Sequence, residues 1–158
     1  MKTPLVSVII PVFNQEKWIG RCLRSLLNQV MNRSDYEIIV IDDGSGDRTD
    51  FALDLFKDEI QLIKNEKNEG LPSALNKGIK ASKANHIVRV DGDDYVNEHF
   101  IFLLHEFMEQ NKYMDAIACD YFIIDDQEAV IARNNCMENP IGCGIMFKSS
   151  HLFEIGLY

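Results

Sequence analysis

Three carboxylates, Asp91, Asp93 and Asp94, follow the apolar run of residues 87–90. Such a run is typical of a buried strand, and in an open α/β sheet ligands bind just beyond the carboxyl ends of the strands. Neighbouring carboxylates repel one another unless a cation lies among them. Because Mg²⁺ and Mn²⁺ prefer oxygen ligands, the cluster indicates a metal site for a phosphorylated ligand. A solvated acidic turn is the alternative, and the cluster alone does not decide between them.

Composition narrows the class of ligand. A chain of 158 residues is long enough for one domain with a sizeable core. Its net charge of −9 argues against nucleic acid as the main partner. An acidic protein that binds an anionic phosphate needs a counter-cation, and a bound metal is the simplest supplier.

The sequence also indicates a compartment. No apolar run reaches the length of a membrane span, and the N-terminus leads directly into a strand pattern, which leaves no room for a signal peptide. The four cysteines form no Cys-x-x-Cys pair and are expected to be reduced. Cys136, Cys143 and His151 match no usual zinc spacing. We expect a cytoplasmic protein without a transmembrane segment, and leave open peripheral association with the inner face of the membrane.

The elements that must position the acidic cluster follow from hydrophobic periodicity. Apolar runs predict buried strands, and apolar residues at helical spacing predict amphipathic helices between them. This alternation predicts an α/β fold, with a mostly parallel, Rossmann-like sheet flanked by helices on both faces. Pro11 is expected to end the first strand, and Asp47 to cap the second helix. The predicted strands are 5–10, 37–41, 60–63 and 86–90, and the predicted helices are 17–30, 51–56, 71–82 and 100–108.

After residue 114 the pattern changes. Residues 115–124 and 129–132 read as strands joined by a turn at 125–128. The glycine-punctuated residues 141–147 predict a strand with a bulge or a close backbone approach.

Three loops are expected at one edge of the sheet, namely residues 11–14, 42–47 and 91–94, because each follows a parallel strand. Phe13 could offer an aromatic face to a nucleobase or pack against the following helix. Asp43 could accept the ring N–H of a pyrimidine. Arg89, a charge in a buried strand, could pair with an aspartate or touch phosphate, and pairing is favoured.

Four motifs carry a family resemblance. Val-Ser-Val-Ile-Ile-Pro-Val-Phe-Asn at 6–14 resembles the opening of family 2 glycosyltransferases, which have a GT-A fold. Val-Ile-Asp-Asp-Gly-Ser at 40–45 resembles their second signature, and Asn-Glu-Gly at 68–70 with Asn-Lys-Gly at 76–78 resembles their third. Arg-Val-Asp-Gly-Asp-Asp at 89–94 resembles their Asp-x-Asp metal motif. The motifs occur in order and at family-like spacing over nearly the whole chain.

The resemblance implies a role for each matched position. It implies a divalent Mn²⁺ or Mg²⁺ ion held by Asp91, Asp93 and Asp94, with Asp93 and Asp94 ranked above Asp91. Residues 142–147 resemble the segment that lines the donor-sugar and acceptor pocket. Contacts to a nucleotide-sugar donor are implied for Pro11, Phe13, Asn14, Asp42, Asp43, Asn68, Gly70, Asp91 and Gly92.

The resemblance further implies an inverting enzyme. It would move a hexosyl or N-acetylhexosaminyl group from a nucleotide-diphosphate sugar, with UDP the expected nucleotide, to a saccharide or glycoconjugate acceptor in polysaccharide biosynthesis. The family's general base lies downstream of the segment matching 149–158, so we expect the base beyond Tyr158 and no catalytic base in this chain.

The resemblance thus predicts an incomplete active site within one domain. Residues 1–114 are expected to be the nucleotide-binding half, and 115–158 the start of a donor-sugar and acceptor half that is incomplete at its C-terminal end. A non-catalytic nucleotide-sugar-binding module, or an inactive fragment, is the alternative.

Overall fold

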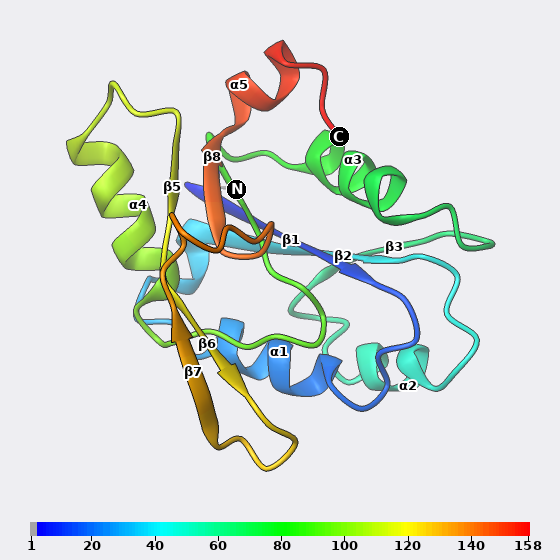
Figure 1. The fold of residues 1–158 in the computed structure, drawn as a ribbon. Coiled ribbons are helices and arrows are strands. Elements are labelled where there is room, and N and C mark those ends of the chain that lie inside the picture. Colours follow the sequence, from blue (N-terminus) through cyan, green and yellow to red (C-terminus); the bar gives the residue numbers. More distant parts are fainter. Residues whose placement is uncertain (1–2) are drawn as a thin grey trace.

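The structure is a computed structural model that describes residues 3–158 (Figure 1). Its helices are α1 (Ile19–Leu27), α2 (Thr49–Asp54), α3 (Leu71–Ala81), α4 (Phe100–Gln110) and α5 (Ser149–Glu154), with a short 3₁₀ helix at Arg33–Asp35. Its strands are β1 (Val6–Val12), β2 (Tyr36–Asp42), β3 (Gln61–Lys64), β4 (His86–Arg89), β5 (Ala116–Ala118), β6 (Tyr121–Ile124), β7 (Val130–Asn134) and β8 (Ile145–Lys148).

The main sheet has six strands in the order β3-β2-β1-β4-β8-β5. The first four are parallel, and β8 pairs antiparallel with both β4 and β5. Helices α3 and α5 cover one face of the sheet, whereas α1, α2 and α4 lie on the other side (Figure 1). The predicted α/β fold with a mostly parallel sheet between two helical layers is confirmed.

Burial on both faces explains the continuous apolar strands. In β1, alternate side chains point to opposite faces, so Val8 packs in the core shared with α1, whereas Ile9 packs in the core shared with α3. The same alternation places Ile39 and Ile41 of β2 on the α3 side.

Pro11 does not end the first strand, contrary to the prediction. Strand β1 runs on to Val12, and Pro11 pairs in register with Ile41 of β2. Pro11 lies two residues beyond Ile9, whose carbonyl accepts a hydrogen bond from Val90 on the β4 side. Residues 9 and 11 of a strand direct their N–H groups to the same side, which here is the side of β4. Because the pairing of β1 with β4 ends at Ile9, no strand lies beside position 11 to accept an N–H, and proline, which has none, is tolerated there.

The expected single strand 115–124 is also corrected. It divides into β5, which pairs with β8, and β6, which forms a separate hairpin with β7. The carboxylate of Asp120, between the two strands, accepts a hydrogen bond from the Cys136 N–H and pairs with Arg133, which lies on β7. These contacts hold the chain on the hairpin rather than along β8.

Other boundaries agree more closely. The N-cap of α2 is Arg48, one residue after the predicted Asp47, and it makes no side-chain capping bond. Asp47 nevertheless accepts hydrogen bonds from the N–H and hydroxyl of Thr49 at the start of the helix. Helix α1 is shorter at both ends than the predicted 17–30. The turn at 125–128 is present, with Asp125 accepting the N–H groups of Gln127 and Ala129. No helix within residues 3–158 is both long and apolar enough to cross a membrane.

A glycine in α3 sets how closely that helix approaches the sheet. A Cβ on Gly78 would lie 2.6 Å from Ile9 Cγ2 and 2.7 Å from Ile41 Cδ1. We expect Gly78→Ala to lower the free energy of unfolding by about 1–3 kcal/mol, because overpacking a tight core costs that much. Chemical denaturation measures this. Gly46→Ala is the matched control, since a Cβ there meets no atom within 4 Å. Equal stability of the two variants would contradict the prediction.

Candidate functional site

The loops that follow β1 and β2 are fastened together at the carboxyl edge of the sheet. The side-chain oxygen of Asn14 accepts the Gly46 N–H at 2.8 Å, and the Asn14 N–H donates to the hydroxyl of Ser45 at 3.0 Å. Asn14 adopts a left-handed backbone with φ 55°. The N–H of Ser45 in turn donates to the carboxylate of Asp42 at 3.0 Å. These contacts give the two loops one fixed arrangement.

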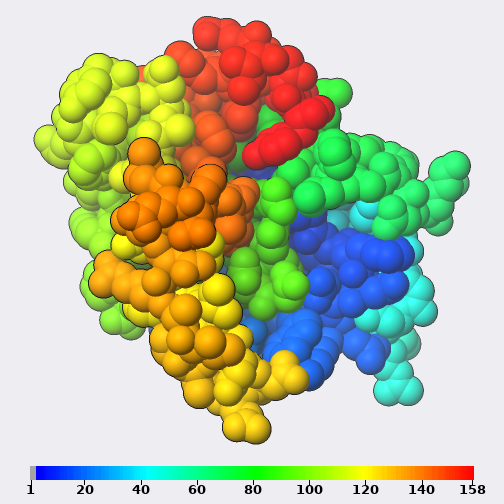
Figure 2. Space-filling view, viewed as in Figure 1, coloured from blue at the N-terminus to red at the C-terminus, as the bar shows by residue number. Residues whose placement is uncertain are grey.

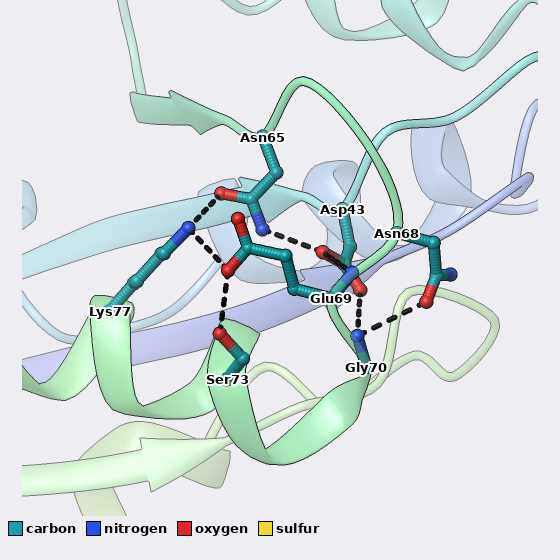
Figure 3. A network of polar contacts seen from close by, with 7 residues as sticks. All are labelled: Asp43, Asn65, Asn68, Glu69, Gly70, Ser73 and Lys77. Carbon is teal, nitrogen blue, oxygen red and sulfur yellow. Dashed lines mark hydrogen bonds and ion pairs between the residues drawn. The ribbon is translucent and has the colours of Figure 1, made fainter.

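Asp43 connects these loops to a third, which follows β3. Its Oδ1 accepts the side-chain N–H of Asn65 at 2.6 Å and the backbone N–H of Glu69 at 2.9 Å, and its Oδ2 accepts the Gly70 N–H at 2.8 Å (Figure 3). Gly70 immediately precedes α3 and has φ 90°. Asp43 is only 4% exposed, so this carboxylate first of all holds the 65–70 loop in place.

Lys77 of α3 completes this network (Figure 3). Its Nζ lies 2.7 Å from Asn65 Oδ1 and 2.8 Å from Glu69 Oε2. Burial opposes ionisation of Asp43, but the hydrogen bonds from Glu69, Asn65 and Gly70, with the charge of Lys77, together hold its pKa below the ordinary value. Asp43 therefore remains an anion inside the loop that it organises.

In the acidic loop after β4, Arg89 pairs with Asp91, as favoured from the sequence. Arg89 Nε lies 2.6 Å from Asp91 Oδ1, and the second contact, to Oδ2, measures 2.9 Å. A Cβ on Gly142 would lie 2.7 Å from the Arg89 guanidinium. The close backbone approach predicted for the 141–147 segment thus occurs against Arg89, although strand β8 begins only at Ile145.

Asp94 lies beside the thiol of Cys143. Ligand atoms of Asp91, Asp94 and Cys143 all lie within 4.8 Å of one another. Desolvation raises the pKa of Asp94, a hydrogen bond from Cys143 lowers it, and the charges of Asp91 and Asp93 raise it again, with a net upward shift. Burial and the charge of Asp94 also raise the pKa of Cys143, so this thiol is neutral and the carboxylates supply the hard donors.

The carboxylate of Asp93 is exposed and lies outside this group, whereas its backbone carbonyl accepts a hydrogen bond from Arg21 at 3.1 Å. The Arg21 guanidinium stacks over the rings of Tyr95 and Trp18 and pairs with Glu128 of the hairpin at 3.1 Å. Arg21 thereby ties α1 to both the acidic loop and the β6–β7 turn.

A cleft of about 1560 Å³ opens beside the acidic loop. It lies between α1, α4 and the hairpin, with Asp93, Asp94 and Cys143 in its lining. Figure 2 shows the loop after β4, in green, at the surface between the blue N-terminal segment and the orange segment that precedes β8. The acidic loop thus borders both the cleft and the loops after β1 and β2.

Tyr158, beyond which the general base is expected, is held against α3. Its N–H donates to the side-chain oxygen of Asn76 at 3.0 Å, and its carbonyl accepts the Asn76 side-chain N–H at 3.0 Å. Burial lowers the pKa of Arg89, but the hydrogen bond and charge of Asp91, with a smaller effect of Tyr158, give a net upward shift. The hydrogen bonds between Tyr158 and Asn76 are structural, so Tyr158 itself is assigned no catalytic role. A general base beyond Tyr158 stays a prediction.

The structure brings most of the predicted residues to one edge of the sheet. Phe13 is 45% exposed beside the buried Asp42 and Asp43. Asn68 accepts the Gly70 N–H, and Gly92 packs near Val12 at the end of β1. Among residues 3–158, no group of side chains close enough to share a cation contains Cys143 together with Cys136 and His151.

Sequence reasoning missed Arg21, and it assigned no contacts to Lys77 and no partner to Cys143. The spacing of Trp18 and Arg21 on one helix indicates their stacking, but nothing in the sequence indicates that Arg21 also reaches Asp93. Lys77 lies within one of the motifs, whereas its contacts with Asn65 and Glu69 depend on how the 65–70 loop folds.

The chain is similar in sequence to known glycosyltransferases. The family model described as glycosyl transferase family 2 matches residues 7–151. The glycosyltransferase EpsJ of Bacillus subtilis (strain 168) is 42% identical over 121 residues, which are 75% of this chain and 34% of EpsJ.

Solved structures resemble the fold over the whole chain. S. aureus TarS 1–349 in complex with UDP-GlcNAc has a TM-score of 0.83 at 21% identity, covering 98% of this chain and 48% of that one. The mannosyltransferase PcManGT from Pyrobaculum calidifontis, in complex with GDP-Man and Mn²⁺, has a TM-score of 0.80 at 20% identity, covering 100% and 48%. The fold is therefore of the GT-A type, and the chain spans between a third and a half of the length of these proteins.

Proposed function

The chain belongs to glycosyl transferase family 2, and from this we propose that it binds a UDP-linked sugar, with a divalent metal, for inverting transfer to a saccharide or glycoconjugate acceptor. The observation that carries the proposal is that Asn14 and Asp43 hold the loops after β1, β2 and β3 together, while Gly92 of the acidic loop after β4 packs near the end of β1. Residues 1–114 form the nucleotide-binding half in this proposal, and 115–158 contribute to the donor-sugar and acceptor side.

The nucleoside would lie over the ends of β1 and β2. Phe13 leaves its ring exposed there, which suits stacking on a base. Asp43 accepts three hydrogen bonds from the protein, and a carboxylate has about four lone-pair sites. One acceptor site on Oδ2 therefore remains for the ring N–H of a uracil. Pro11, Asn14, Asp42, Asn68, Gly70 and Gly92 are proposed to shape this site.

The acidic loop suits a divalent cation. Asp94 and Asp91 bring carboxylate oxygens close together. Burial, and then the charges of Asp91 and Asp93, raise the pKa of Asp94, and a cation among these groups would offset their repulsion. Asp93, exposed at the rim of the cleft, can turn toward the same ion. A bound Mn²⁺ or Mg²⁺ would act as a Lewis acid that offsets charge on the departing diphosphate.

Residues of the protein would orient the metal ligands and receive the acceptor. Arg89 holds Asp91 in a fixed orientation through two hydrogen bonds, so at least one ligand is positioned in advance. Gly142 keeps the segment before β8 close to Arg89. The cleft beside Asp93 and Asp94 would receive the acceptor, with Trp18, Tyr95 and Tyr121 in its lining, and aromatic side chains offer apolar faces of the kind that sugar rings bury.

Isothermal titration calorimetry with UDP and Mn²⁺, run beside a sugar-transfer assay, tests the proposal. We expect Mn²⁺ to be required for tight UDP binding, and little or no transfer by the 158-residue chain, because the family's general base is expected outside the matched motifs. Binding that is indifferent to Mn²⁺ would contradict the metal assignment. Robust transfer would contradict the expected location of the base, and the absence of UDP binding would overturn the proposed function.

A further inference from the structure

A second cluster of metal-binding side chains lies at the opposite end of β4. His86 is the first residue of that strand, whereas the acidic loop follows its last. His105 and Glu109 lie one turn apart on α4, which places them on the same side of the helix. Both histidines are 6% exposed. The cluster therefore joins the sheet to α4 away from the proposed donor site.

The geometry of the two imidazoles suits a shared ion. His86 Nδ1 and His105 Nδ1 lie 3.2 Å apart. A tetrahedral Zn²⁺ with Zn–N bonds of about 2.0–2.1 Å separates its ligand atoms by roughly 3.3 Å. The rings meet edge to face, with centroids 5.2 Å apart and an interplanar angle of 66°. The two Nδ1 atoms face each other in a hydrogen bond, which an ion bound between them would replace.

Glu109 can supply a third ligand. One ligand atom from each of His86, His105 and Glu109 lies within 4.8 Å of the others. Glu109 Oε1 lies 4.0 Å from Nε2, the ring nitrogen of His86 that does not face His105, so Glu109 must turn toward Nδ1 to share the ion. The Glu109 side chain is 43% exposed and pairs at 3.7 Å with the largely exposed Lys112. Such an exposed pair contributes little free energy, so Glu109 can turn inward toward an ion.

The surroundings allow a cation to enter. A surface depression of about 310 Å³ reaches His86 and Glu109, and Lys112 and Lys148 also line it. The nearby ammonium of Lys148 donates to the Lys112 carbonyl at 2.7 Å and lies 3.4 Å from Asp115 Oδ1. Its charge is thus partly compensated by groups outside the cluster.

We propose that His86, His105 and Glu109 form a second metal site, selective for an imidazole-preferring transition metal such as Zn²⁺, that clamps β4 to α4. Imidazole ligands favour Zn²⁺, whereas carboxylates favour Mg²⁺ and Mn²⁺. The chain would then hold two chemically different ions at the two ends of one strand. Because the site is remote from the donor loops, it does not depend on the proposed function.

The test is thermal unfolding of the chelator-treated chain with and without Zn²⁺, in the wild type and in Glu109→Gln. We expect Zn²⁺ to raise the melting temperature, since an ion that binds only the folded state stabilises it. In Glu109→Gln the apparent affinity should fall at least about tenfold, because even outer-shell partners of a metal contribute about 10- to 100-fold. Glu106→Gln is the matched control, with the same change on an exposed residue of α4, and should respond as the wild type.

Two further measurements identify the ligands. His105→Gln, checked for folding by circular dichroism without metal, should lose the Zn²⁺ response, whereas Asp93→Ala/Asp94→Ala should keep it. Co²⁺ should give visible d–d absorption without the intense near-ultraviolet bands of cysteine ligation. No Zn²⁺ response in the wild type, an equal response in all variants, or thiolate bands would each overturn the proposal, and the first would leave the histidines as a hydrogen-bonded pair.

Discussion

Replacing Asp93 and Asp94 together by alanine is expected to abolish the Mn²⁺-dependent binding of UDP. Both side chains are exposed in the loop after β4, so their removal leaves the core intact. Without them, only Asp91, held by Arg89, remains of the carboxylates proposed to hold the ion, and the other two proposed carboxylate ligands are lost. We expect the Mn²⁺-dependent affinity to fall by more than about 100-fold, because even outer-shell partners of a metal contribute about 10- to 100-fold.

Calorimetry with UDP and Mn²⁺ measures this effect. The matched control is Asp54→Ala/Asp58→Ala, which removes the same charge from exposed positions in α2 and the segment after it. Asp91 is left unchanged because its removal would leave the Arg89 guanidinium without its carboxylate partner, and an unpaired buried charge disturbs the fold itself. If the double variant binds UDP with Mn²⁺ as tightly as the control does, the acidic loop is not the metal site.

The layout of the donor half could be predicted because it depends on local patterns. The apolar runs of β1, β2 and β4 are buried in the sheet, so the parallel strands and their alternation with helices follow from periodicity. The polar residues at the strand ends, Asp43 and Asp94 among them, then had to meet at one edge. The pairing of Arg89 with an aspartate followed from its charge in an otherwise apolar strand.

Features that depend on the packing of distant segments could not be predicted in this way. Pro11 is tolerated within β1 only because β4 ends two residues earlier, which is a property of the sheet register. The division of 115–124 depends on Asp120 meeting residues of β7 and the segment after it. Likewise, His86 and His105 are 19 residues apart in the chain, and no spacing rule connects a strand residue with a residue in the middle of the following helix.

Replacing Asp43 by asparagine is expected to release the 65–70 loop, the largest stability effect that we predict. The carboxylate accepts hydrogen bonds from Asn65, Glu69 and Gly70, whereas an amide offers only one acceptor oxygen and would direct its NH₂ group at another donor. Because each buried donor left without an acceptor costs about 1–3 kcal/mol, we expect the free energy of unfolding to fall by about 3 kcal/mol.

UDP binding should weaken in the same variant, since the proposed donor site loses both its loop and the acceptor for the uracil N–H. Chemical denaturation and calorimetry measure the two effects on one preparation. Asp54→Asn, at an exposed position of α2, controls for the loss of one negative charge. Wild-type stability of Asp43→Asn would mean that the loop does not depend on this carboxylate.

The pH dependence of the free energy of unfolding, compared between the wild type and Asp43→Asn, distinguishes loss of the carboxylate charge from a change in packing. The folded-state pKa of Asp43 is held below its ordinary value, so its ionised carboxylate contributes stability that is complete above the unfolded-state pKa, which is about 3.9. That contribution disappears as the pH falls through the lower, folded-state pKa. The wild type should therefore lose stability more steeply than Asp43→Asn as the pH falls below about 5, and the difference between them should narrow. A constant difference across this range would show that the carboxylate charge does not hold the loop, and that the variant is destabilised by packing alone.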